Sequence, residues 1–244
     1  MAHFQQLEFI RIVRNSFPEA FAGSKVLEVG SWDVTGTIRG FFSECEYLGV
    51  DITSGPGIDM VCQGQDLDLP SNSFDVVVSC ECFEHNKYWL ETFTNMTRML
   101  KPGGLFIMSC AAPGRIEHGT SRRSVGSSLT ASFGKSDYYR NLCARDIQRR
   151  FPLANHFDEY GFAVPNYIND LYFIATKRGG GSGAVRGQAV KQALQQAAAV
   201  ALPEQSTQRD RWQRLALTWT GRAMEHALGA KNYQDLAFAI HKNL

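Results

Sequence analysis

The sequence predicts an α/β fold with a mostly parallel β-sheet. Four short apolar runs support this prediction, at residues 26–29, 47–51, 74–79 and 105–110. Continuous apolar runs of this length are typical of strands that are buried on both faces of a parallel sheet. Between the last two runs, residues 88–100 carry apolar side chains at helical spacing, which indicates a helix packed on the sheet.

The first element of the chain is expected to be a helix. Phe4, Leu7, Ile10 and Val13 lie near helical spacing and predict an amphipathic helix over residues 3–15. Further along, the pattern predicts a short strand at 58–62, a short helix at 144–151 and two closing strands at 157–164 and 170–177.

The first strand, residues 26–29, stops at Gly30, and the segment from Thr35 to Phe42 can start a helix. A strand that stops at glycine before a helix brings backbone amides close to a ligand. Ligands of open α/β sheets bind beyond the carboxyl ends of such strands. Glu28, inside this strand, is either a solvated edge residue or a hydrogen-bond acceptor that faces the ligand.

The turn after the first strand argues against a dinucleotide ligand. The G-x-G-x-x-G fingerprint is absent, because Ser31 and Trp32 follow Gly30 and the next glycine is Gly36. A pyrophosphate needs close backbone approach at several glycines, and Glu28 would repel it. A ligand with a cationic or amino-acid end suits this strand end better.

Four motifs lie in order over roughly residues 20–180. They are Val-Leu-Glu-Val-Gly-Ser at 26–31, Gly-Val-Asp at 49–51, Phe-Asp-Val-Val-Val-Ser at 74–79 and Leu-Lys-Pro-Gly-Gly at 100–104. Their order and spacing resemble the class I S-adenosylmethionine-dependent methyltransferases. The resemblance implies a Rossmann-like, seven-stranded, mostly parallel sheet with an antiparallel edge strand. Trp32 and Val34 depart from the family's E/D-x-G-x-G-x-G turn, where small residues are usual.

The resemblance also implies a cofactor site for S-adenosyl-L-methionine, with S-adenosyl-L-homocysteine as product. Asp51 would bind both ribose hydroxyls, although an acid at this place can also be a turn former or helix cap. Gln65 or Asp66, with a slight preference for Asp66, would accept a hydrogen bond from the adenine amino group. The expected cofactor-binding residues are Glu28, Gly30, Ser31, Gly36, Asp51, Ile52, Gln65, Asp66 and Cys80.

Two histidines are the candidates for a general base. Methyl transfer from a sulfonium requires alignment and exclusion of water, and it needs a base only if the acceptor loses a proton. The Glu84-His85 pair resembles small-molecule methyltransferases, so His85 either caps the next helix or faces the cofactor and substrate. His118 is preferred because it lies in the long loop that follows the 105–110 strand.

Residues 111–141 are expected to form a substrate lid, since a loop this long in a compact domain is usually functional or disordered. The candidate substrate-binding residues are Arg122, Arg123, Tyr138 and Tyr139. The side chains of the two arginines could bind a carboxylate or a phosphate. The D/N-P-P-Y/F motif of the enzymes that methylate amino groups of DNA or protein glutamine is absent, and Ser79-Cys80 is a poor match to a cytosine-C5 nucleophile.

The composition bears on the partners, the metal content and the cellular location of the protein. The net charge of +1 hides a local basic excess at 114–150 and 184–244, which fits either an anionic partner or solvated segments. The six cysteines form no C-x-x-C pair, so we expect free thiols and no bound metal. No apolar run reaches the ~18 residues of a membrane span, and no secretory signal is visible, which predicts a cytoplasmic protein without a membrane partner.

Three regions are expected along the chain. They are a methyltransferase domain at 1–178, a Gly/Ser linker at 179–183 and an α-helical C-terminal appendage at 184–244. In the appendage, Trp212, Ala216, Trp219 and Ala223 share one helical stripe that needs a partner. That partner is its own helices, the main domain or a second copy of the chain.

The leading functional hypothesis is S-adenosylmethionine-dependent methylation of a small polar metabolite, with O-methylation of a sugar or related hydroxyl preferred. One alternative is an RNA or protein methyltransferase that uses the basic lid and tail, although a nucleic acid is not favoured. The other alternative is a non-catalytic cofactor-binding subunit of a larger assembly.

Overall fold

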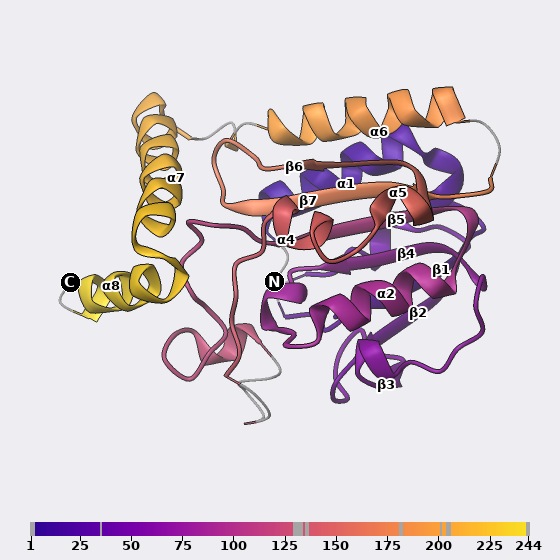
Figure 1. Ribbon diagram of the computed structural model, residues 1–244, viewed down its shortest axis with the longest axis horizontal. Coiled ribbons are helices and arrows are strands. Elements are labelled where there is room, and N and C mark those ends of the chain that lie inside the picture. The colour runs from indigo at the N-terminus through magenta and orange to yellow at the C-terminus, as the bar shows by residue number, and fades with distance from the viewer. Residues whose placement is uncertain are drawn as a thin grey trace.

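A computed structural model describes residues 3–34, 36–128, 134, 137–180, 183–200, 202–203 and 206–242 of the 244-residue chain. Its centre is one seven-stranded sheet with the strand order β3-β2-β1-β4-β5-β7-β6 (Figure 1). The strands are β1 Lys25–Val29, β2 Glu46–Asp51, β3 Met60–Val61, β4 Phe74–Cys80, β5 Leu100–Ala111, β6 Phe157–Ala163 and β7 Asp170–Lys177.

The direction of the strands confirms the predicted sheet and refines it. β3, β2, β1, β4 and β5 pair in parallel, whereas β7 runs antiparallel to both β5 and β6. The antiparallel strand therefore lies one place in from the edge, and the edge strand β6 has the same direction as the parallel set. Val76, Val77 and Val78 of the central strand β4 are fully buried, as a strand covered on both faces requires.

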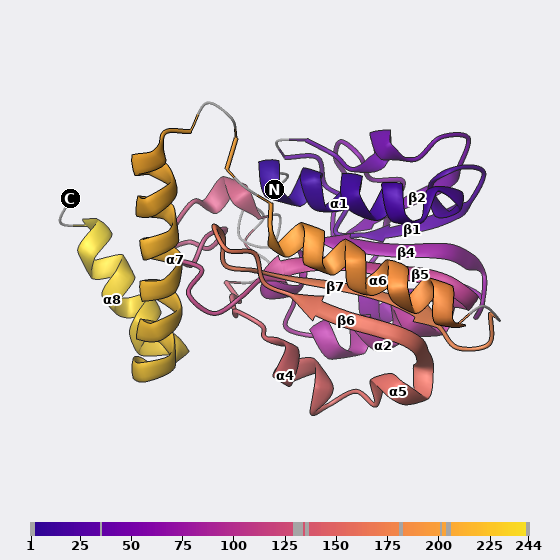
Figure 2. The same ribbon diagram turned by 90° about the horizontal axis from the view of Figure 1, so that it is seen from above.

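Two layers of helices cover the sheet (Figure 2). On one face, α1 Phe4–Ser16 and α6 Gly183–Ala198 form a core with the strands, which includes Phe9, Ile10, Val190 and Leu194. On the other face, Phe93 and Met96 belong to a second core, which the covering helices share with the strands. The helices of this face are α2 Trp89–Met99, α4 Ala144–Gln148 and α5 Leu153–His156.

The helix that the sequence allowed from Thr35 to Phe42 is absent from the described part of that segment. Only a short 3-10 turn, η2, forms there at Arg39–Phe41. Gly36 has a φ of +139°, which an α-helix cannot contain, and the Asp33 carboxylate accepts a hydrogen bond from its backbone N–H at 2.8 Å. The Asp33 side chain therefore satisfies this backbone donor within the loop.

In the described part of the chain, three helices follow the last strand, and they differ in how they pack on the sheet. α6 is part of the layered domain, because Val190, Ala193 and Leu194 are buried against α1 and the sheet. α7 Gln208–Leu228 and α8 Ala230–Lys242 stand beside the layers, at the end of the sheet where the loop after β5 emerges (Figures 1 and 2). The division at residues 178–184 stays a prediction. None of the helices in the described ranges is long and apolar enough to cross a bilayer.

Candidate functional site

A cavity of about 880 Å³ lies at the carboxyl ends of β1, β2 and β4. All nine residues that the sequence assigned to a cofactor line it: Glu28, Gly30, Ser31, Gly36, Asp51, Ile52, Gln65, Asp66 and Cys80. The volume lies within the range of small-molecule sites, and the place is the one where open α/β sheets bind ligands.

The floor of the cavity is a close junction of three strand ends. Gly30 has a φ of +86°, and a Cβ added there would lie 2.5 Å from Cβ of Cys82. Its N–H donates to the carbonyl of Val50 at 2.8 Å, and Ser79 Oγ donates to the carbonyl of Val29 at 2.7 Å. Glycine is therefore required at position 30 for both its backbone conformation and the space it leaves.

Asp51, at the end of β2, is tied to the loop after β1. Its Oδ2 accepts from the N–H of Trp32 at 3.2 Å, and its Oδ1 accepts from the N–H of Ile52 at 2.8 Å. Burial raises the pKa of this carboxyl above its ordinary value, although the two backbone N–H groups favour the ionised form. Asp51 thus fixes the backbone around Trp32 and presents a carboxylate to the cavity.

Glu28 is a second carboxyl group in the cavity wall. It is 5% exposed, so the interpretation as a solvated edge residue is wrong. Its Oε2 accepts a hydrogen bond from the hydroxyl of Tyr47 at 2.7 Å. Burial raises the pKa of Glu28 to about 7, against the favourable effects of Tyr47 and Arg39 on the ionised form. Its charge is therefore easily changed near neutral pH.

Gln65 and Asp66 lie in a 3-10 turn, η3 Gly64–Asp66, that α2 holds in place. The side-chain amide of Asn95 donates to the carbonyls of Gly64 and Leu67, both at 2.9 Å. The Gln65 amide donates to Asp66 Oδ2 at 3.2 Å. Both side chains line the cavity, so the two alternatives for the adenine contact remain open.

The thiol of Cys80 is buried at the end of β4, and burial raises its pKa to about 12. A thiol that stays protonated is not a nucleophile, which agrees with the poor match to a cytosine-C5 enzyme. The next residue, Glu81, has a φ of +52°, and its Oε1 accepts from Ser109 Oγ at 2.9 Å. Non-glycine residues in this conformation carry backbone strain, which is common beside functional sites.

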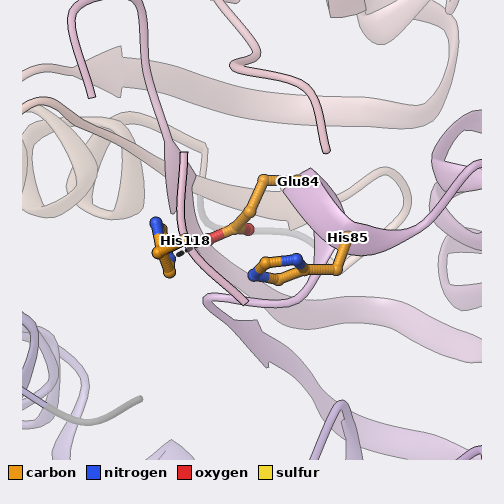
Figure 3. Close-up of side chains that lie close together, drawn as sticks. All are labelled: Glu84, His85 and His118. Atoms are coloured by element: carbon orange, nitrogen blue, oxygen red, sulfur yellow. Dashed lines mark ion pairs between the residues drawn. The ribbon is translucent and has the colours of Figure 1, made fainter. Parts of the chain in front are cut away.

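His85 and His118 come together at one end of the site, and their ring centroids lie 5.2 Å apart (Figure 3). His85 is part of the turn η4 Phe83–His85 and lines the cavity. His118, from the lid, packs on His85 and on the ring of Tyr139, with centroids 5.2 Å apart in both cases. Burial and the neighbouring His118 lower the pKa of His85 to about 3, and burial and Arg115 lower that of His118 to about 4. Both rings are therefore neutral at physiological pH.

Glu84 is a third member of this cluster, and the sequence analysis did not assign it a role. Its side chain is fully buried, and its Oε1 lies 3.9 Å from Nε2 of His118 (Figure 3). Burial and the nearby Glu81 raise the pKa of Glu84 to about 8. The signal in the sequence was its place beside His85, at the carboxyl edge of the sheet.

A second buried cluster joins α1 to the strands. His3 Nε2 lies 2.9 Å from Asp170 Oδ2, and Arg115 Nη1 donates to Asp170 Oδ1 at 2.6 Å. Arg115 also lies 3.9 Å from Glu81. Burial alone would raise the pKa of Asp170, but Arg115 and His3 hold it below its ordinary value. No local pattern could have revealed this cluster, because its members come from distant parts of the chain.

The four expected substrate residues do not gather at the cavity. Arg122 donates to Asp235 of α8 at 3.0 Å, and its guanidinium lies over the ring of Phe238. Arg123 exchanges backbone hydrogen bonds with Thr120, and the hydroxyl of Tyr138 interacts with Arg140. Tyr139 contacts both histidine rings. Among the described residues of the lid, Ser127 and Ser128 line the cavity instead.

Residues 41–108 match the model of a family described as a methyltransferase domain. The matched segment extends from the end of η2 to β5 and therefore contains Asp51, η3 and the Glu84-His85 pair. No curated protein matches the chain at a significant level.

Solved structures share the fold. Phosphoethanolamine N-methyltransferase 2 of Haemonchus contortus, in complex with S-adenosyl-L-methionine, gives a TM-score of 0.51 at 17% identity, over 70% of this chain and 52% of that enzyme. The same enzyme with phosphomonomethylethanolamine and S-adenosylhomocysteine gives a TM-score of 0.50, with the same identity and coverage. The chain thus spans about half the length of that enzyme.

A third structure is a 1,6-didemethyltoxoflavin-N1-methyltransferase of Burkholderia thailandensis with bound 1,6-didemethyltoxoflavin and S-adenosylhomocysteine. It gives a TM-score of 0.49 at 16% identity, over 70% of this chain and 79% of that chain.

Proposed function

We propose that this chain is a class I S-adenosylmethionine-dependent methyltransferase and that it methylates a hydroxyl of a sugar or a related small polar metabolite. The observation that carries the proposal is that Glu28, Asp51 and His85 line one and the same cavity. Two carboxyl groups suited to a cofactor and a side chain suited to the acceptor therefore share one space.

The cofactor site fits S-adenosyl-L-methionine in its donor groups. Asp51 offers carboxylate oxygens to a ribose diol, and Glu28 offers one to a cationic or amino-acid end. Ser31 Oγ is buried in the cavity wall without a hydrogen-bond partner among the described residues, so it can bond to a ligand there. The cofactor supplies a methyl group on a sulfonium. Gln65 or Asp66 would accept from the adenine amino group.

The acceptor is placed beside His85, where the cavity borders the cluster of Glu84, His85 and His118. A hydroxyl loses its proton when it is methylated, so the group that handles this proton must lie at that border. The assignment of His118 or His85 as the base remains a proposal. The volume of the cavity lies in the range of small-molecule sites, which favours a metabolite as the acceptor.

The test is calorimetric titration of the purified protein with S-adenosyl-L-methionine and S-adenosyl-L-homocysteine, beside an Asp51→Ala variant. We expect micromolar binding that weakens at least tenfold in the variant. Glu46→Gln, on the exposed face of the same strand, is the matched control and should bind as the parent does. A folded protein that binds neither compound would refute the proposal.

The alternative of an RNA acceptor has less support. Arg115, Arg122 and Arg140 of the basic lid each pair with a carboxylate of the chain itself, on Asp170, Asp235 and Asp146. RNA binding that falls steeply with salt would favour this alternative. The cytoplasmic location expected from the sequence stays a prediction.

The hypothesis of a non-catalytic cofactor-binding subunit in a larger assembly depends on the C-terminal helices. α7 packs on the domain through Thr218, Gly221 and Glu225, whereas Trp212 and Trp219 are 65% and 61% exposed. Exposed apolar side chains of this size mark interaction surfaces. We propose that α7 and α8 pair with those of a second copy.

A further inference from the structure

Three groups with lone pairs converge at the border of the cavity without a positive partner. One ligand atom from each of Glu84, His85 and His118 lies within 4.8 Å of the other two. Figure 3 shows the Glu84 carboxylate and the ring of His85 pointing toward the ring of His118. Glu84 is 0% exposed and His85 is 7% exposed, so water does not solvate these groups freely.

The hydrogen bond of His118 decides which of its ring nitrogens carries the proton. Nδ1 lies 3.1 Å from the carbonyl oxygen of Ile116. A carbonyl only accepts, so Nδ1 donates and Nε2 of the neutral ring keeps its lone pair. That lone pair is 3.9 Å from Oε1 of Glu84. When Glu84 is ionised, as a metal ligand has to be, two atoms that both carry lone pairs therefore face each other in a buried place.

The remaining atoms of the cluster are also without partners. Neither carboxylate oxygen of Glu84, nor Nδ1 of His85, has a hydrogen-bond partner among the described residues. Buried polar atoms are rarely left in this state, so the cluster requires an electron-pair acceptor, which is either a proton on Glu84 or a bound cation. Arg115 does not fill this role, because its guanidinium bonds to Asp170 and lies beside Glu81.

The other cluster of potential ligands serves as an internal comparison. His3, Glu81 and Asp170 also bring three ligand atoms together. There, Arg115 supplies the positive charge at 2.6 Å from Asp170. Arg115 thus supplies a cation to that cluster, although His3 Nε2, Glu81 Oε2 and Asp170 Oδ2 also have no hydrogen-bond partner in the described part of the chain. Of the two clusters found among the described residues, that of Glu84, His85 and His118 has no such cation.

We propose that Glu84, His85 and His118 bind a divalent transition-metal ion at the edge of the cavity. Two imidazole nitrogens and one carboxylate oxygen are a common donor set for Zn²⁺, Mn²⁺ and Fe²⁺. Ligation at ~2.1 Å requires the three side chains to move together by about 1 Å. This site replaces the expectation from the sequence that no metal is bound.

The surroundings of the cluster support ligation. The carbonyl of Ile116 fixes the tautomer and orientation of His118, as partners of metal-bound histidines usually do. The ring of Tyr139 packs on both imidazoles. A Cβ added to Gly119, whose φ is +62°, would lie 2.7 Å from Cε1 of His85. The backbone of the lid at Gly119 therefore packs directly against the imidazole ring of His85.

Three protein ligands leave coordination positions open, as in catalytic metal sites. Because His85 lines the cavity, an oxygen atom of an acceptor can reach such a position. Metal ligation uses the imidazole lone pairs that a base would need, so with an ion bound neither His85 nor His118 is the base. The ion would lower the pKa of a bound hydroxyl, so that its proton leaves to solvent before the O–CH₃ bond forms and the S–CH₃ bond breaks. This role, unlike metal binding itself, rests on the proposed function.

The test is titration of chelator-treated full-length protein with Zn²⁺ by calorimetry and with Co²⁺ by absorption spectroscopy. We expect one equivalent to bind, with a Co²⁺ spectrum of nitrogen and oxygen ligands and no thiolate charge-transfer band. Glu84→Gln and His118→Gln should weaken binding at least tenfold. His226→Gln, on the exposed side of α7, is the matched control and should bind as the parent does.

Two results would overturn the proposal. One is a folded parent protein that binds no ion, which would mean that a shared proton holds the cluster together. The other is binding that both ligand variants retain, or a thiolate band in the parent, which would place the ion elsewhere. The Co²⁺ spectrum of the parent tests the donor set even if a variant fails to fold. Binding of S-adenosyl-L-methionine by the same samples tests the proposed function separately.

Discussion

The backbone of Gly114 packs directly on that of Gly221, where α7 meets the loop after β5. A Cβ added to Gly114 would lie 2.6 Å from the N atom of Arg222, and one added to Gly221 would lie 2.8 Å from the carbonyl oxygen of Gly114. Glu225, one turn further along α7, accepts from the Gly114 N–H at 2.6 Å and from the Asn141 amide at 2.8 Å. The lid and the C-terminal helices are thus joined at one tight junction.

Gly221→Ala should loosen this junction. Alanine favours an isolated helix by about 1 kcal/mol over glycine, but overpacking at a closed contact costs about 1–3 kcal/mol. We expect faster hydrogen exchange in α7 and in residues 112–118, while the sheet keeps its protection. Thr220→Ala, at the exposed neighbouring position, is the control. Equal or slower exchange in Gly221→Ala would show that the contact is easily relieved.

Glu28 should make stability depend on pH. Its pKa is about 7 in the folded protein and 4.5 when unperturbed, so the folded state holds a proton that the unfolded state releases between these values. The free energy of unfolding therefore falls as pH rises through this window, by about 3 kcal/mol from this group. Glu28→Gln should match the parent below pH 4.5 and exceed it by a similar amount above pH 7.

Urea unfolding at a series of pH values measures this difference. The contribution of Glu84, whose pKa is also raised, is present in both proteins and cancels in the comparison. Glu46→Gln is the control, because its side chain is 73% exposed and pairs with Lys25 at the surface. A constant offset between parent and Glu28→Gln across the series would contradict the prediction.

Local patterns predicted the strands, most of the helices and the nine cofactor residues that line the cavity, because these depend on short stretches of sequence. The strand that ends at Gly30 and the acid that ends β2 meet at the sheet edge in any parallel arrangement. The partner of Arg122 could not be predicted in this way. Asp235 is 113 positions away in the sequence, and only the docking of α8 brings it to the lid.

The position of α6 is a second case that local patterns missed. Its sequence, rich in Ala and Gln, follows a glycine-rich segment and carries only a weak apolar stripe. Yet α6 covers β6, and a Cβ added to Gly161 would lie 2.7 Å from Cδ1 of Leu194. The absence of a side chain at Gly161 of β6 allows this close approach, which no periodicity in the sequence reveals.

Truncation should show that α6 belongs to the folding unit. Ending the chain at residue 178 removes α6. It exposes the apolar surface of α1 and the sheet against which Val190, Leu194 and Ala197 are buried. Each large apolar side chain contributes about 1.5–3 kcal/mol, against a total stability of about 5–15 kcal/mol. We expect fragment 1–178 to unfold or aggregate, and fragment 1–203 to fold and bind S-adenosyl-L-methionine. A fragment 1–178 with parent-like thermal unfolding would contradict this prediction.

The exposed face of α7 should mediate self-association. Trp212 and Trp219 lie about 100–120° around the helix from Thr218, away from the docked side, and both are more than half exposed. Burial of two indole rings in a paired interface favours association, and Trp is frequent among the residues that dominate interface energies. Light scattering after size exclusion should give twice the chain mass of 27.2 kDa for the parent protein and the single mass for Trp212→Ser/Trp219→Ser.

The double variant leaves the docked side of α7 unchanged, so circular dichroism and binding of S-adenosyl-L-methionine should match the parent. Gln213→Ala/Thr220→Ala, two exposed polar positions on the same helix, is the control and should keep the mass of the parent. A parent protein that runs as a single chain at all concentrations would exclude self-association. The apolar face of α7 would then require a partner other than a second copy.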